Sequence, residues 1–199
     1  MSFRIEDKIP LAKYDKFLLH GNLINKGMVK LYPDRFIHSI YFDNNHFEMY
    51  KDSIEGSLPR KKVRIRNYDK TQKYNFEIKI SSVEGRYKKT LPLSHNQYIN
   101  KLTTGYLDFH YGLVKPIIKI SYKRMYYQYK SLRITFDSEI KFFKYTDLSS
   151  YFASDKNVME IKSPDLNQKS IIDILIPFEK KRYSKYTEAV EYLNMINCL

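Results

Sequence analysis

Five short segments of this chain alternate charged side chains with apolar ones. Successive side chains on a β-strand point to opposite faces, so each segment would place its charges on one face and its aliphatic residues on the other. Most of these charges are basic, and each segment has a carboxylate in it or nearby. Five such strands predict a sheet whose charged face has a function. The segments are Arg4-Ile5-Glu6-Asp7-Lys8, Lys62-Val63-Arg64-Ile65-Arg66, Glu77-Ile78-Lys79, Arg133-Ile134-Thr135-Phe136-Asp137 and Glu160-Ile161-Lys162.

The overall charge indicates what such a face would bind. The chain has 199 residues, of which 43% are hydrophobic, and this is enough for a packed core in a single domain over residues 1–199. Its formal net charge of +13 favours anionic partners. Nucleic acid, phosphates and an anionic membrane surface all remain open on charge alone. The alternating strands predict a polyanion bound with the help of a metal ion.

Several kinds of site are excluded by motifs that the sequence lacks. Cys198 is the only cysteine, so an internal disulfide and a cysteine-rich zinc site are ruled out. The five histidines show no metal-ligand spacing. The glycine motifs of P-loop, Rossmann and serine-hydrolase sites are absent. No apolar core of signal-peptide length and no stretch of roughly 20 apolar residues occurs, so we expect a soluble cytoplasmic protein.

The periodicity predicts an α+β chain with an antiparallel sheet. About eight strands are enough to close into a barrel, and the charged faces would then line a hydrated tunnel while the aliphatic faces pack outward under helices. Such an inversion costs several kcal/mol per unpaired ion unless charges pair or a ligand enters. The predicted strands cover 3–9, 37–43, 61–68, 73–81, 86–93, 116–129, 131–139 and 157–163. The predicted helices cover 10–26, 46–52, 95–103 after the N-cap Ser94, 168–175 and 186–197.

The basic residues with the parity of the tunnel face are the first candidates for phosphate binding. Arg forks match phosphate oxygens in a bidentate manner, and Lys adds point charges. For any one of them a solvated surface charge is the simpler interpretation, but the set repeats with one parity on many strands. The candidates are Lys8, Arg64, Arg66, Lys79, Arg124, Arg133 and Lys162.

Carboxylates on the same strands are candidates for a hard divalent cation, which takes carboxylate and phosphate oxygens as ligands. They are Glu6, Glu77, Asp137 and Glu160. The alternative is that they neutralise basic neighbours, which suits Glu6 and Glu77. Glu160 is the first choice for the metal, with Glu6 as a second ligand candidate.

The segment 180–186 precedes the last predicted helix and contains Arg182, Ser184 and Lys185. A hydroxyl, basic side chains and free N–H groups at a helix N-terminus form an anion site. A basic surface loop is the equally acceptable alternative.

These motifs, taken in order along the chain, resemble the VTC domain. That domain is the polyphosphate polymerase module of the vacuolar transporter chaperone complex and a relative of the triphosphate tunnel metalloenzymes. The N-terminal Arg4-x-Glu6-x-Lys8 is similar to the ExExK strand of those enzymes, with Arg4 in place of the first glutamate, which argues against a second metal site. The other matching motifs are Lys62–Tyr68, Glu77–Lys79, Tyr122–Arg124, Arg133–Asp137, Glu160–Lys162 and Ser184–Tyr186.

The resemblance implies an antiparallel tunnel barrel that binds nucleoside triphosphate and polyphosphate with Mn²⁺ or Mg²⁺. By motif position, Glu160 would hold the metal. Lys88 is assigned to the inner face because Lys89 shares the parity of Leu91 and Leu93. The catalytic residues would be Arg64, Arg66, Arg124, Arg133 and Lys185. The substrate-binding residues would be Lys8, Lys79, Lys88, Lys162, Arg182 and Ser184.

The leading hypothesis is therefore a polyphosphate polymerase that passes the γ-phosphoryl group of ATP to a growing chain. The same fold with water as acceptor would be a tripolyphosphatase or nucleoside triphosphatase. A non-catalytic module that binds polyphosphate or an inositol polyphosphate is a different class, and a nucleic-acid binder is the third, disfavoured because the charges lie within strands. Among partners, we expect ATP and polyphosphate, no specific nucleic acid, and a membrane protein only as a separate chain.

Overall fold

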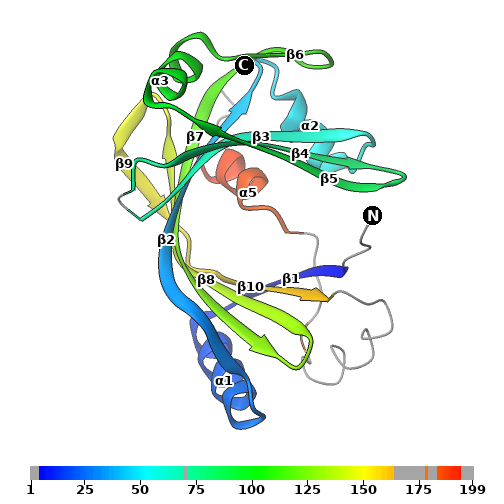
Figure 1. Ribbon diagram of the computed structural model, residues 1–199, viewed down its shortest axis with the longest axis vertical. Coiled ribbons are helices and arrows are strands. Elements are labelled where there is room, and N and C mark those ends of the chain that lie inside the picture. The colour runs from blue at the N-terminus through cyan, green and yellow to red at the C-terminus, as the bar shows by residue number, and fades with distance from the viewer. Residues whose placement is uncertain (1–4, 70, 164–177, 179–182, 194–199) are drawn as a thin grey trace. The chain divides into compact units, whose positions relative to one another are not determined.

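The computed structural model describes residues 5–69, 71–163, 178 and 183–193 (Figure 1). Its helices are α1 (Lys13–Asn25), α2 (Glu48–Glu55), α3 (His95–Thr104) and α5 (Lys185–Tyr192). Its strands are β1 (Ile5–Leu11), β2 (Val29–Asp43), β3 (Arg60–Tyr68), β4 (Tyr74–Ser82), β5 (Gly85–Leu93), β6 (Tyr106–Asp108), β7 (Gly112–Tyr129), β8 (Leu132–Lys144), β9 (Asp147–Ala153) and β10 (Asn157–Ser163). None of the described helices is long and apolar enough to cross a membrane.

The strands form one ten-stranded sheet whose main path runs β1-β10-β8-β7-β2-β3-β4-β5. Two short additions lie off this path, since β6 pairs with β7 and β9 pairs with β8. The registered pairs along the path, such as β3 with β4 and β1 with β10, are antiparallel. The predicted α+β class with an antiparallel sheet is therefore confirmed.

The chain divides into two compact units. Unit 1 comprises residues 1–36, 122–140 and 153–183, and unit 2 comprises residues 37–121, 141–152 and 184–199. Strands β2, β7 and β8 contribute residues to both units. The sequence prediction of one domain and that of a single tunnel stay predictions, and each unit is described by itself below.

In unit 1, strict alternation on the strands separates an apolar face from a charged one. Ile134 and Phe136 of β8 and Met159 and Ile161 of β10 lie in one buried cluster, while the residues between them point to the other face. Helix α1 covers the apolar face through Leu19 and Leu23, which are also part of that cluster. Burying each such aliphatic side chain contributes about 1.5–3 kcal/mol, and this favours the register that leaves the charges together.

Unit 2 has the same construction on different strands. Val63 and Ile65 of β3 lie in a buried apolar cluster with Phe42 of β2 and Phe76 of β4. Helix α3 packs against this cluster through residues such as Tyr98, whose ring stacks on Tyr74 with centroids 3.7 Å apart. The even-numbered residues of β3 are consequently directed to the opposite face.

Element boundaries correct the sequence prediction in several places. Helix α1 begins at Lys13, because Pro10 lies in β1. That strand ends the main path, where proline, which has no N–H to donate, is tolerated. Strand β2 begins at Val29 instead of residue 37, and strands β6 and β9 were missed. The predicted helix over 168–175 lies outside the described residues.

Other boundaries agree closely with the prediction. Ser94 caps α3 as expected, accepting a hydrogen bond from Gln97 N and forming a full capping box. Strands β3, β4, β5 and β10 fall within one or two residues of their predicted limits, which is the usual uncertainty of an element end. The last helix begins at Lys185, one residue before its predicted start, with Ser184 as its N-cap, but it ends at Tyr192 and not at residue 197 as predicted.

Candidate functional site

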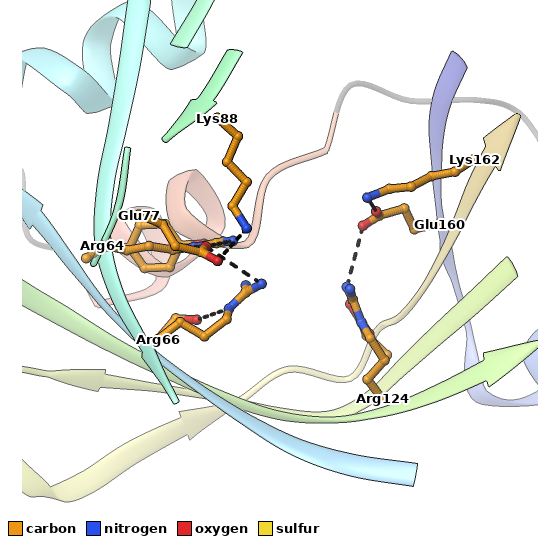
Figure 2. A network of polar contacts seen from close by, with 10 residues as sticks. Arg64, Arg66, Glu77, Lys88, Arg124, Glu160 and Lys162 are labelled. Carbon is orange, nitrogen blue, oxygen red and sulfur yellow. Dashed lines mark hydrogen bonds and ion pairs between the residues drawn. The ribbon is translucent and has the colours of Figure 1, made fainter. Parts of the chain in front are cut away.

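The charged face of unit 2 is organised around the carboxylate of Glu77 on β4. Arg64, its direct neighbour on β3, places Nε 2.6 Å and Nη2 2.5 Å from Glu77 Oε2. Lys88 on β5 places its Nζ 2.5 Å from Glu77 Oε1, and Arg66 Nη1 lies 4.0 Å from Oε2. Figure 2 shows these side chains pointing toward one another. One buried carboxylate thus holds three cations from the two strands that flank β4.

The pKa of Glu77 reports the excess of positive charge. Burial alone would raise this pKa, but Arg64, Arg66 and Lys88 outweigh burial and lower it to about 2. Three cations therefore lie around this one carboxylate and keep it ionised.

Three lysines in adjacent positions extend this positive face. Lys62 of β3 lies directly opposite Lys79 of β4, and Lys79 lies directly opposite Lys88 of β5. Like charges in register across strands destabilise a sheet. Lys88 is drawn to Glu77, and Lys62 Nζ donates to Ser184 Oγ at 2.7 Å. A row of this kind is suited to a ligand with several negative charges.

Tyr41 of β2 lies on the other side of Arg64 in the same row. Its hydroxyl accepts a hydrogen bond from Arg64 Nη1 at 2.9 Å, and the side chain is almost fully buried. Burial favours the neutral phenol, but Arg64, Arg66 and Lys62 outweigh it and lower the pKa of Tyr41 from 10.0 to about 8. A phenol with a lowered pKa is a second sign of concentrated positive charge.

Helices α2 and α5 hold Tyr41 in place. The ring of Tyr186 in α5 stacks on Tyr41 with centroids 5.1 Å apart. The Tyr186 hydroxyl in turn donates to Asp43, whose carboxylate also accepts from Met49 N at 3.1 Å and Tyr50 N at 3.0 Å in the first turn of α2. The site face of unit 2 therefore has a rigid support made of hydrogen bonds.

The charged face of unit 1 is organised around a cation instead. Arg124 of β7 forms a bidentate pair with Asp137 of β8, with Nε–Oδ1 2.6 Å and Nη2–Oδ2 2.7 Å. Its Nη2 also lies 3.5 Å from Oε2 of Glu160 on β10, and Lys162 Nζ lies 2.8 Å from Glu160 Oε1 (Figure 2). Arg124, Asp137 and Glu160 are all buried.

The ionisation of these groups follows from their pairing. Burial opposes the charged form of Glu160, but Arg124, Lys162 and Lys8 outweigh it and hold its pKa well below the usual range. Burial likewise opposes the charge of Arg124, and Asp137 outweighs it, so the pKa of Arg124 is raised further. At neutral pH Glu160 is therefore a carboxylate and Arg124 is a guanidinium cation.

The edge of unit 1 continues the alternation of charges. Lys8 of β1 lies directly opposite Glu160, and Glu6 lies directly opposite Lys162. Within β1, Lys8 Nζ is 3.2 Å from Glu6 Oε1. Arg133 of β8 lies opposite Lys162 on the next strand, with its guanidinium 5.9 Å from the ring centroid of Tyr126. Arg133 and Lys162 are thus two cations in direct register.

The structure divides the sequence-predicted site residues between the two units. Lys88 shares the face of Arg64 and Glu77, whereas Lys89 lies opposite Ile78 on the apolar side. Arg182 lies outside the described residues. Unit 2 contains Arg64, Arg66, Lys79, Lys88, Ser184 and Lys185, and unit 1 contains Glu6, Lys8, Arg124, Arg133, Glu160 and Lys162.

Sequence reasoning missed several residues of these faces. Lys62 has the same parity as Arg64, and this signal was sufficient to include it. Ser39, whose Oγ accepts from Arg66 Nε at 3.1 Å, and Tyr41 could not be found from their own segment, because it contains no alternating charge. Asp137 was identified as a carboxylate on the right strand but not as the partner of Arg124.

Glu160 is the carboxylate of unit 1 whose surroundings suit a divalent cation. Among the described residues no group of three or more His, Cys, Asp or Glu side chains is arranged to hold a metal. Cations in phosphoryl-transfer sites need only one or two carboxylates, because phosphate and water supply the other oxygens. Glu160 fits this role, since among the described residues its Oε2 is held only by the 3.5 Å contact with Arg124. In contrast, Glu77 is fully engaged by cations.

Comparisons with known proteins bear on the fold and the family. A crystal structure of a candidate adenylate cyclase from Bacillus halodurans has a TM-score of 0.61 at 15% identity, covering 94% of this chain and 98% of that one. A Pyrococcus horikoshii protein has a TM-score of 0.60 at 15% identity, covering 97% and 99%. A candidate adenylyl cyclase from Hippeastrum with a dominant triphosphatase activity has a TM-score of 0.57 at 13% identity, covering 96% of each chain.

No curated protein matches the sequence. The family model described as the VTC domain matches residues 3–194, which is nearly the whole chain. The solved structures above share the fold of this chain, and the predicted fold class is confirmed. The chain belongs to the VTC domain family.

Proposed function

We propose that this chain is a metal-dependent polyphosphate polymerase. In this reaction a terminal oxygen of the polyphosphate chain forms a bond to the γ-phosphorus of ATP, the bond to the β-phosphate oxygen breaks, and ADP leaves. Membership of the VTC domain family supports the assignment, as does a sheet whose charged faces hold several buried or half-buried cations.

One observation carries the proposal furthest. Lys62, Lys79 and Lys88 lie in register on three neighbouring strands, next to Arg64 and Arg66. Lysine side chains opposite one another repel, so the arrangement is stabilised when a ligand spans them. Phosphate groups linked in a chain present negative charge at regular intervals, and this suits such a row better than a single isolated anion does.

The proposed roles follow from the contacts within each unit. In unit 2, Arg64 and Arg66 bind phosphate oxygens and stabilise charge that develops during transfer, while Lys79 and Lys88 bind further phosphates. Ser184 and Lys185, at the start of α5, orient a phosphate at the helix N-terminus. Because Arg64 is fixed by Glu77 and Tyr41, little reorganisation is needed when the substrate binds.

In unit 1, Arg124, Arg133, Lys8 and Lys162 are proposed to bind phosphate oxygens. Glu160 would hold Mn²⁺ or Mg²⁺, with Glu6 as the second candidate ligand. Bound there, the cation would neutralise phosphate charge and polarise the phosphoryl group. Asp137 keeps Arg124 in a fixed orientation, because both of its oxygens are bound to that guanidinium.

A triphosphatase is the second candidate, in which water accepts the phosphoryl group. The observation that favours it is the dominant triphosphatase activity of the Hippeastrum protein, which has the same fold. Phosphate binding by the two charged faces would serve either reaction equally.

Product analysis tests the proposal. The purified protein is incubated with ATP and Mn²⁺, and the products are separated on a gel that resolves polyphosphate chains while free phosphate is measured in parallel. Long chains are the expected result. Free phosphate without chains would replace the polymerase by the triphosphatase, and tight binding of polyphosphate without turnover would leave only a binding module.

A further inference from the structure

Thr135 lies on the charged face of unit 1 with a buried hydroxyl that has no partner. The residue is 3% exposed, and among the described residues its Oγ1 makes no hydrogen bond. A buried hydroxyl without a partner is costly, and native proteins rarely leave one unless a water, an ion or a ligand completes it. This atom is therefore a marker for a bound group.

The strand register places Thr135 beside the proposed metal carboxylate. Thr135 of β8 lies directly opposite Glu160 of β10, so their side chains are neighbours on one face. Asp137, two residues further along β8, binds Arg124 through both carboxylate oxygens at 2.6 and 2.7 Å and makes no hydrogen bond to Thr135.

Glu160 likewise has a carboxylate oxygen that lacks a close hydrogen-bond partner among the described residues. Its Oε1 is held by Lys162 at 2.8 Å, whereas Oε2 has, within the described part of the chain, only the 3.5 Å contact with Arg124. A charge-assisted hydrogen bond between these groups is normally near 2.7–2.9 Å. Two neighbouring oxygens, one a carboxylate and one a hydroxyl, are thus both underused on the same buried face.

We propose that Thr135 is a binding residue of this site, and that its Oγ1 and Glu160 Oε2 together hold one oxygen-bearing group of the ligand. That group is an oxygen of the phosphate chain or of a water bound to the divalent cation. A hydroxyl suits either because it both donates and accepts. The inference rests on the proposed function, since it names a further residue of the same site.

A purely structural role does not explain the hydroxyl. A β-branched residue fits a strand at this position, but Val has the same shape as Thr and no polar atom to bury. If the hydroxyl bound no ligand, Thr135→Val would be at least as stable as the unmodified protein and would bind tripolyphosphate equally well. The two roles therefore differ in a measurable way.

The test compares Thr135→Val and Thr135→Ser with the unmodified protein by thermal unfolding, without ligand and during titration with tripolyphosphate. Without ligand, Thr135→Val is expected to unfold at the same or a higher temperature. In the presence of Mn²⁺, its apparent affinity for tripolyphosphate should fall about ten-fold, whereas Thr135→Ser should lose much less.

Thr90→Val is the matched control. Thr90 lies opposite Glu77 in unit 2 as Thr135 lies opposite Glu160, but Thr90 is exposed and Glu77 is fully engaged. This variant should leave the titration unchanged. A loss of affinity for Thr90→Val equal to that of Thr135→Val would overturn the inference.

Repeating the titration without Mn²⁺ identifies the group that is held. A loss in Thr135→Val that is seen only with Mn²⁺ points to a water of the cation, and a loss under both conditions points to a phosphate oxygen. Two results would refute the inference, provided that tripolyphosphate stabilises the unmodified protein. One is an affinity of Thr135→Val for tripolyphosphate equal to that of the unmodified protein. The other is a clearly lower unfolding temperature of Thr135→Val without ligand. If tripolyphosphate does not stabilise the unmodified protein at all, the proposed function fails with it.

Discussion

The two charged faces of this protein are built in opposite ways. In unit 2 a single carboxylate, Glu77, lies among the cations Arg64, Arg66 and Lys88. In unit 1 a single guanidinium, that of Arg124, lies between the carboxylates Asp137 and Glu160. The first arrangement groups three cations around one carboxylate. The second leaves, within the described residues, one oxygen of Glu160 with only a 3.5 Å contact. We infer that unit 2 is suited to phosphate alone and unit 1 to phosphate together with a cation.

The largest expected effect is a loss of stability when the buried ion pair between Arg124 and Asp137 in unit 1 is broken. Asp137→Asn removes the bidentate partner of Arg124, and Asp137 is completely buried. Breaking a buried pair from one side costs about 3–5 kcal/mol because it leaves an uncompensated charge. We expect a loss of this size in the free energy of urea unfolding. Glu77→Gln should cost less, because the Lys88 side chain is 45% exposed and can turn to solvent. An equal cost would contradict the contrast between the units.

The next effect separates the two carboxylates that are candidates for the metal. Glu160→Gln should lower ATP turnover by about 10²-fold or more while the protein stays folded, because Arg124 keeps Asp137 as its partner. Glu6→Gln should lower turnover far less, because Glu6 contacts Lys8 at the edge of the sheet. Turnover and the unfolding temperature are measured for both variants as Mn²⁺ is varied. If Glu6→Gln showed the larger loss, the assignment of Glu160 would be wrong.

A smaller effect distinguishes the two faces of β5. Lys88→Ala should weaken tripolyphosphate binding about ten-fold, as expected for the loss of one charge-assisted contact. Lys89→Ala is the matched control, since it removes the same charge from the adjacent residue on the opposite face. Isothermal titration of both variants measures the difference. Equal losses would mean that only the net charge matters.

The smallest effect concerns the ionisation of Tyr41. Its pKa is lowered from 10.0 to about 8 in the folded chain, so between these pH values the unfolded chain binds more protons. The contribution of Tyr41 to stability is therefore complete above pH 10 and is lost as the pH falls through 8. When the pH is raised, tyrosinate absorbance should show a transition near pH 8 that is missing in Tyr41→Phe. Tripolyphosphate should shift this transition upward, and an unmoved transition would place the ligand elsewhere.

Residue alternation within a strand was sufficient to predict which side chains lie on the charged face of the sheet and which lie on the apolar face. It placed Arg64 and Arg66 on one side of β3 with Val63 and Ile65 on the other, and it separated Lys88 from Lys89. These assignments depend only on the period of two residues per strand and on the preference of aliphatic side chains for the core. The N-cap at Ser94 could also be predicted, because the capping box involves only Ser94 and Gln97, three residues apart in the sequence.

Contacts between distant segments could not be predicted in the same way. Tyr41 became part of the site only through its register with Arg64 and its stacking on Tyr186. The orphan hydroxyl of Thr135 depends on which residue of β10 lies opposite it. The first half of β2 was missed because Pro33 interrupts a segment with no clear alternation. Register is a property of pairs of strands, and one strand does not contain it.

The carboxylate of Glu77 also affects how the binding of a polyanion responds to ionic strength. Binding to a basic surface is usually driven in part by the release of ions that had condensed on the two partners. Arg64 and Lys88 already have an internal counterion that is covalently part of the fold and cannot be released. Affinity should therefore decline less steeply with added electrolyte than the number of basic side chains suggests.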